Sequence, residues 1–178
     1  MLFRLLLFFF LLTISFYSYG QKIIISGKET SRPLVWKDFS GTPDNNSPFY
    51  ALTWWNLRFR YESVEYNGNN AQLTGFQVQL ELDPEKSWVK PGKETDYLLA
   101  HEQLHFNMGI LCMREIIAAV NSATLKKNDY NEAIRNLFSA IMTKYKAMGN
   151  KYDEETNHGA NKEQQEKWSE LIAKEMAK

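Results

Sequence analysis

Alternating apolar and polar residues predict a β-sheet in the first half of the chain. Residues 56–61 and 72–82 both alternate with the two-residue period of a half-buried strand. Residues 67–70 (Asn-Gly-Asn-Asn) between them are typical of a hairpin turn. Residues 22–26 form a further short strand candidate. We therefore expect an antiparallel or mixed sheet of three or four strands.

The pattern changes to a helical period after the turn at Pro91-Gly92. A long helix is expected to start between Glu94 and Asp96, with Thr95 or Asp96 as its N-cap, and to end before residues 121–128. Its expected inward stripe comprises Tyr97, His101, Leu104, His105, Met108, Cys112 and Ile116. Second and third helices are expected from about Asp129 to His158-Gly159 and over 162–176. The fold class predicted is α+β, with the sheet packed on the long helix and on further C-terminal helices.

The first twenty residues have the pattern of a signal peptide. A short positive start is followed by an apolar run from Leu5 to Ile14, and Ser18 and Gly20 are small residues suited to cleavage before Gln21. This predicts a signal peptide over 1–20, a single domain over 21–178 and a secreted or periplasmic location. An uncleaved N-terminal anchor is the alternative. No later segment is long and apolar enough to span a membrane.

Composition narrows the classes of partner. The 178 residues carry no net charge, which argues against a nucleic-acid partner. The only cysteine, Cys112, excludes an internal disulfide, and its apolar helical setting favours a buried small hydrophobe over a nucleophile.

The strongest chemical signal is the sequence H-E-x-x-H at residues 101–105. Side chains four residues apart share one face of a helix, so His101 and His105 can bind the same metal ion. Glu102 is turned about 100° from His101, which places its carboxylate beside the metal, where it can take a proton from a water molecule.

A catalytic zinc takes three protein ligands, and the motif supplies two. Glu115 lies ten residues beyond His105, roughly 15 Å along the helix, which is too far for the same ion. His158 is the only other histidine, and it follows a helix that must pack on the first, so we expect it to be the third ligand. Glu155 is the next choice of ligand and Asp153 or Glu154 follow, although Asp153 could instead hold a ligand imidazole in place. His158 could alternatively be a surface histidine near the C-terminus of the helix.

Several segments together resemble a bacterial family of secreted zinc-dependent proteases. They are H-E-Q-L-H-F at 101–106, Y-D-E-E-T-N-H-G at 152–159, Gln165 with Trp168, and W-K-D-F-S-G-T-P-D at 36–44. The resemblance covers most of the chain beyond residue 20. It implies a zincin-like fold with Zn²⁺ held by His101, His105 and His158, and Glu102 as the catalytic residue.

These observations predict a zinc metallopeptidase acting on a peptide or protein substrate. Glu102 would act as general base, and Tyr152 is a candidate donor to the oxyanion, although a core tyrosine is an equal alternative. A non-catalytic exported zinc-binding protein of the same fold, recognising a peptide or envelope component, is a second hypothesis. Hydrolysis of a non-protein amide, such as a cell-wall peptide, is a third.

Overall fold

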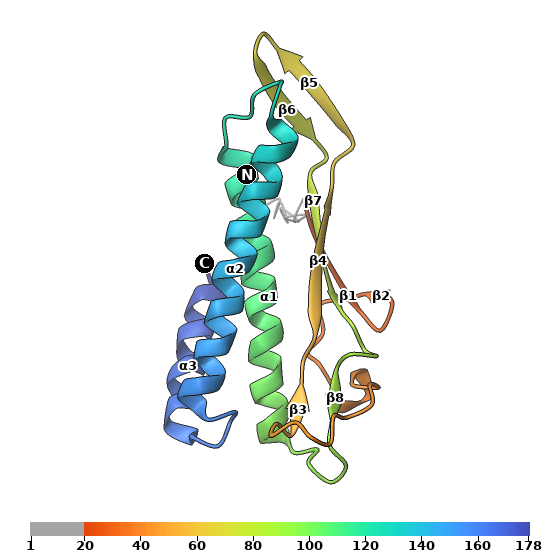
Figure 1. Ribbon diagram of the computed structural model, residues 1–178, viewed down its shortest axis with the longest axis vertical. Helices are drawn as coiled ribbons and strands as arrows, with labels where there is room; N and C mark the ends of the chain where they lie inside the picture. The colour runs from red at the N-terminus through yellow and green to blue at the C-terminus, as the bar shows by residue number, and fades with distance from the viewer. Residues whose placement is uncertain (1–19) are drawn as a thin grey trace, which may run out of the picture.

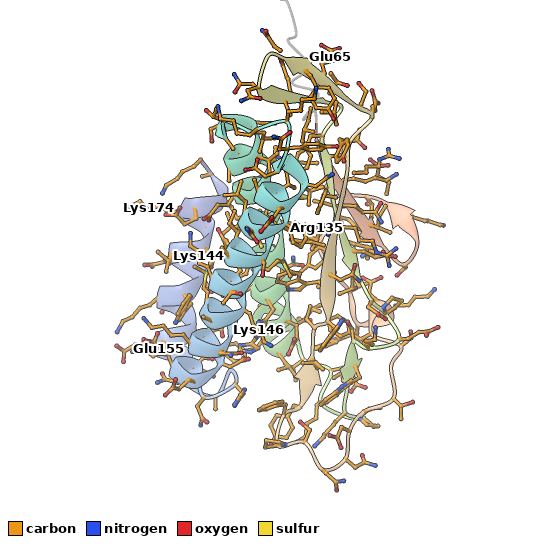
Figure 2. All side chains as sticks on the ribbon, turned by 45° about the horizontal axis from the view of Figure 1, so that its top comes forward. Glu65, Arg135, Lys144, Lys146, Glu155 and Lys174 are labelled. Carbon is orange, nitrogen blue, oxygen red and sulfur yellow. The ribbon has the colours of Figure 1, made fainter. Side chains whose placement is uncertain are left out.

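The computed structural model describes residues 20–178. A sheet forms one side of an elongated molecule and three helices form the other (Figure 1). Side chains from both layers fill the space between them (Figure 2). The predicted signal peptide lies outside the described residues except for Gly20. None of the helices in the described part has a stretch long and apolar enough to cross a membrane.

The main sheet has four strands in the order β2-β1-β7-β4, with β1 and β7 as its inner strands. Strand β1 runs parallel to β7, whereas the β1–β2 and β4–β7 pairs are antiparallel, so the sheet is mixed. The predicted alternation in β7 is confirmed, because Val78, Leu80 and Leu82 are fully buried. The bounds are β1 Gln21–Ile25, β2 Lys28–Glu29, β4 Trp55–Arg60 and β7 Gln77–Leu82.

Two small pairs of strands extend the sheet layer. Strands β5 (Ser63–Asn67) and β6 (Asn70–Thr74) form the hairpin expected at residues 67–70. At the other end, β3 (Ala51–Leu52) pairs with β8 (Trp88–Val89) beside the first turns of the long helix (Figure 1). This second pair places strand β3 next to the part of α1 that carries the H-E-x-x-H motif.

The three helices match the predicted ranges closely. They are α1 Asp96–Ser122, α2 Tyr130–Thr156 and α3 Lys162–Met176. Thr95 is the N-cap of α1, since its side chain accepts a hydrogen bond from the amide of Leu98. Helix α1 lies against the sheet, and α2 and α3 pack on α1.

The inward stripe of α1 differs from the prediction at one end. Tyr97, in the first turn of the helix, is 38% exposed. Cys112 is fully buried, as expected, and burial raises the pKa of its thiol to about 12. A thiol in that state is not a nucleophile near neutral pH.

A buried carboxylate fixes the segment before β3. Asp38, in a short 3₁₀ helix (Trp36–Asp38), accepts hydrogen bonds from Arg32, from the Val35 amide and from Ser26. The Leu34 amide in turn donates to the side chain of Gln103, at 2.7 Å. The N-terminal segment is thereby tied to the middle residue of the H-E-x-x-H motif.

Candidate metal centre

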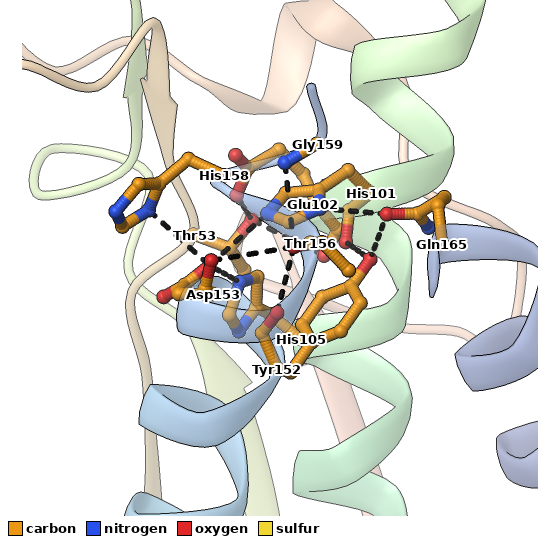
Figure 3. Close-up of polar contacts among 10 residues, drawn as sticks. All are labelled: Thr53, His101, Glu102, His105, Tyr152, Asp153, Thr156, His158, Gly159 and Gln165. Atoms are coloured by element: carbon orange, nitrogen blue, oxygen red, sulfur yellow. Dashed lines mark hydrogen bonds and ion pairs between the residues drawn. The ribbon is translucent and has the colours of Figure 1, made fainter. Parts of the chain in front are cut away.

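Helices α1 and α2 bring three potential metal ligands together. His101 and His105 lie one turn apart on α1, with ring centroids 5.0 Å apart. Oδ1 of Asp153, from the last turn of α2, is 3.1 Å from Nε2 of His101 and 2.9 Å from Nε2 of His105. One ligand atom from each residue lies within 4.8 Å of the other two. Figure 3 shows the three side chains converging.

The hydrogen bond with Gln165 sets the tautomer of His101. Its Nδ1 is 2.9 Å from Oε1 of Gln165 on α3, and an amide oxygen can only accept, so Nδ1 carries the proton. In the neutral ring, Nε2 then presents a lone pair to the carboxylate oxygen of Asp153. Two acceptors 3.1 Å apart repel unless a second proton or a cation lies with them.

The donor set fits zinc. Imidazole nitrogen and carboxylate oxygen are both ordinary zinc ligands, with bonds of about 2.0–2.2 Å. Tetrahedral coordination at those lengths puts neighbouring ligand atoms about 3.3 Å apart. The contacts of Asp153 with the two imidazoles, at 3.1 and 2.9 Å, need only a small separation to admit such an ion.

His158, the expected third ligand, is not one of the three converging residues. Helix α2 ends at Thr156, and Asn157, His158 and Gly159 all take positive φ angles. This left-handed turn directs the His158 side chain toward Phe49, with ring centroids 4.1 Å apart, and leaves it 39% exposed. Its Nδ1 is 3.7 Å from the Asp153 oxygen. The alternative ligand Asp153 is the one that the structure brings to both histidines.

Tyr152, the candidate oxyanion donor, lies behind the histidines. Its side chain is fully buried, and its ring stacks on that of His101 with centroids 4.5 Å apart. Its hydroxyl donates to Oε1 of Gln165 at 2.7 Å, and burial raises its pKa. Tyr152 and Gln165 therefore support the His101 ring from the side away from the pocket.

Glu102 faces the pocket next to the three converging residues. Its side chain is almost fully buried, and one carboxylate oxygen accepts a hydrogen bond of 2.7 Å from the hydroxyl of Thr53. The pocket has a volume of about 370 Å³. It is walled by α1, by α2 and by residues 49–55 of the β3–β4 segment.

The charges of the site are strongly coupled. Burial alone would raise the pKa of Asp153, but its close contacts with the imidazole rings of His101 and His105 lower it well below its usual value. For His105, burial alone would lower the pKa, yet the hydrogen bond to Asp153 and the charge of Glu102 raise it. A half-buried anion between two imidazoles favours any cation that can bind all three.

The other acidic candidates have partners elsewhere. Glu155 accepts from the indole nitrogen of Trp168, at 2.8 Å, on the α3 side of α2. Glu115, excluded by its distance along the helix, contacts Lys144 and Tyr145.

Sequence reasoning did not assign roles to Gln165 and Thr53. The sequence does contain a signal for Gln165. This polar residue lies three and seven positions before the apolar residues Trp168 and Ile172 of α3, so it shares their buried helix face. The sequence contains no such signal for Thr53, because no pattern in the residues around it connects it with the H-E-x-x-H motif of α1.

The comparisons with known proteins place the chain in a family. The model of a bacterial protein family of unknown function, DUF922, matches residues 26–159. That span contains the H-E-x-x-H motif, Asp153 and His158. No curated protein and no solved structure matches the chain significantly. Since the match covers most of its length, the chain belongs to DUF922, a bacterial family of unknown function.

Proposed function

We propose that this protein is an exported zinc-dependent peptidase with a zincin-like fold. The observation that carries the proposal is the direct approach of Asp153 to both motif histidines, with Glu102 on the same pocket. In this proposal His101, His105 and Asp153 hold Zn²⁺. The fold supports it because the motif lies on a long helix that packs under a mixed sheet.

The chain's own groups divide the work of hydrolysis. When bound, zinc lowers the pKa of a coordinated water towards about 7 and polarises a carbonyl oxygen. Glu102 accepts a proton from the attacking water and returns it to the leaving amine. Gln165 and Tyr152 hold the His101 ring in the tautomer that ligates through Nε2. An extended peptide enters the pocket along residues 49–55.

The direct test compares the wild-type chain with Glu102→Gln. Both are loaded with zinc, the metal content is measured, and cleavage of casein and of a peptide library is followed. We expect one zinc per chain in both proteins and about 10²–10⁴-fold slower cleavage by the variant, because the general base is lost. Equal cleavage by the two proteins would contradict the peptidase assignment.

A non-catalytic binding protein is a second candidate, supported by the aromatic side chains at the pocket. Tyr50 and Trp54 are 52% and 47% exposed on the segment that walls it. Exposed aromatic rings are typical of binding surfaces. A zinc-loaded protein that cleaves no peptide but retains peptides on a column would favour this candidate. The same variant, Glu102→Gln, would then bind as well as wild type.

A further inference from the structure

The Glu102 carboxylate is held by one residue from the opposite wall of the pocket. The hydroxyl of Thr53 is 2.7 Å from Oε2 of Glu102 and 3.3 Å from the Glu102 backbone oxygen. A hydroxyl has one proton, so the shorter contact, to the carboxylate, is the donated bond. Among residues 20–178, no other group donates to this carboxylate. Its second oxygen, Oε1, therefore remains free for a water molecule or substrate.

The backbone next to Thr53 is held in place by hydrogen bonds. Thr53 lies between β3 and β4, and the backbone of the next residue, Trp54, contacts the hydroxyl of the fully buried Ser87. The Ser87 hydroxyl accepts from the Trp54 amide at 2.9 Å and is 3.3 Å from the Trp54 carbonyl oxygen. The Asp83 amide donates to that carbonyl at 2.9 Å. The backbone next to Thr53 is thus held by the sheet layer, whereas the Thr53 hydroxyl reaches across to Glu102 on the helix (Figure 3).

We propose that Thr53 is a positioning residue, which fixes the rotamer of Glu102 so that Oε1 faces the reacting water. The proposal rests on the proposed peptidase function. A helix alone fixes the Glu102 backbone but leaves three side-chain torsions free. A charge-assisted hydrogen bond from a rigid neighbour removes that freedom before substrate binds. Thr53 would therefore affect the chemical step more than substrate binding.

The kinetic test uses a matched pair of substitutions. Thr53→Val keeps the shape and removes the hydroxyl, and Thr53→Ser keeps the hydroxyl. With zinc bound, we expect Thr53→Val to lower kcat by about 10–100-fold with little change in KM or zinc content. Thr53→Ser should stay within about threefold of wild type. An unchanged kcat in Thr53→Val, or equal losses in both variants, would overturn the proposal.

A second readout does not depend on activity. In the metal-free chain, Thr53→Val should lower Tm by roughly 2–4 °C, because a buried carboxylate loses its donor. In a Glu102→Ala background the same substitution should lower Tm by less, because only the weaker contact with the backbone oxygen of residue 102 is left to lose. An equal Tm loss in both backgrounds would overturn the coupling between the two residues. Failure of peptide cleavage by wild type, with the coupling present, would instead contradict only the peptidase function.

Discussion

At the scale of single residues, the site depends on which side chain completes the pair of motif histidines. Asp153 lies on the regular part of α2, so its direction is fixed by helix geometry and by the packing of α2 on α1. His158 lies two residues past the helix end, in a turn with positive φ angles that points it toward Phe49. The two candidate ligands therefore differ because Asp153 lies within the helix, whereas His158 lies in the turn that ends it.

Asp153→Ala and His158→Ala should separate these two ligands. We expect Asp153→Ala to weaken zinc affinity by more than about 100-fold, because it removes a group that contacts both imidazoles. His158→Ala should change affinity by less than about threefold. Competitive titration with a chelator gives both values. Loss of zinc in His158→Ala, with retention in Asp153→Ala, would restore the histidine as third ligand.

At the scale of elements, the segment before β3 is held by the Arg32–Asp38 pair. The nearer guanidinium nitrogen is 2.6 Å from the carboxylate, whose side chain is almost fully buried. Burial alone would raise the pKa of Asp38, but the hydrogen bonds from Arg32, Val35 and Ser26 lower it overall. The segment also contacts Gln103, so this cluster connects the N-terminal part of the chain to α1.

Asp38→Asn should destabilise the protein in a pH-dependent way. Because the folded-state pKa lies below the ordinary value of 3.8, the stabilisation is complete above that pH and is lost as pH falls through the folded pKa. We expect a loss of about 1–2 kcal/mol in the free energy of unfolding at pH 7, which shrinks as the pH falls below 3.8. Urea unfolding across this range measures it. Asp44→Asn, in an exposed loop, is the control and should show no such loss; a pH-independent gap for Asp38→Asn would contradict the ionic origin.

At the scale of the whole molecule, the pocket exists only because α1, α2 and the β3–β4 segment come together. Residues Met142, Tyr145, Lys146, Gly149, Asn150 and Asp153 form its α2 wall. Lys146 is the only lysine or arginine among the described residues that line it. It lies seven residues before Asp153, on the same helix face and roughly 10 Å along the axis. An extended peptide covers that distance in about three residues.

Lys146→Gln should therefore reduce the preference for an acidic residue about three positions from the cleaved bond. Two peptides that differ only by Glu or Lys at that position give the preference as a ratio of kcat/KM. We expect the ratio to fall about two- to fivefold, the range of an exposed ion pair. Lys144→Gln is the matched control on the same helix (Figure 2), because Lys144 is paired with Glu115 and does not line the pocket. A similar change in both variants would exclude a local effect of Lys146.

The sequence by itself determined the elements and half of the candidate site. Periodicity and turn residues are local properties, so the hairpin, the three helices and the alternation in β4 and β7 could be predicted, and Thr95 was one of the two expected N-caps. The single strand expected over residues 72–82 is divided in the structure between β6 and β7, which belong to different sheets. The pairing of His101 with His105 and the offset of Glu102 also follow from a single helix. The parallel pairing of β1 with β7 could not be predicted, because it joins segments more than fifty residues apart.

Tertiary structure decided the remaining half of the site. Asp153, Gln165 and Thr53 reach the motif from α2, α3 and the sheet layer, and their distances depend on how those elements pack on α1. Counting histidines favoured His158, but a count contains no information on the direction of a side chain after a helix end. The geometry of that turn, and the packing that brings α2 to α1, place Asp153 between the two imidazoles.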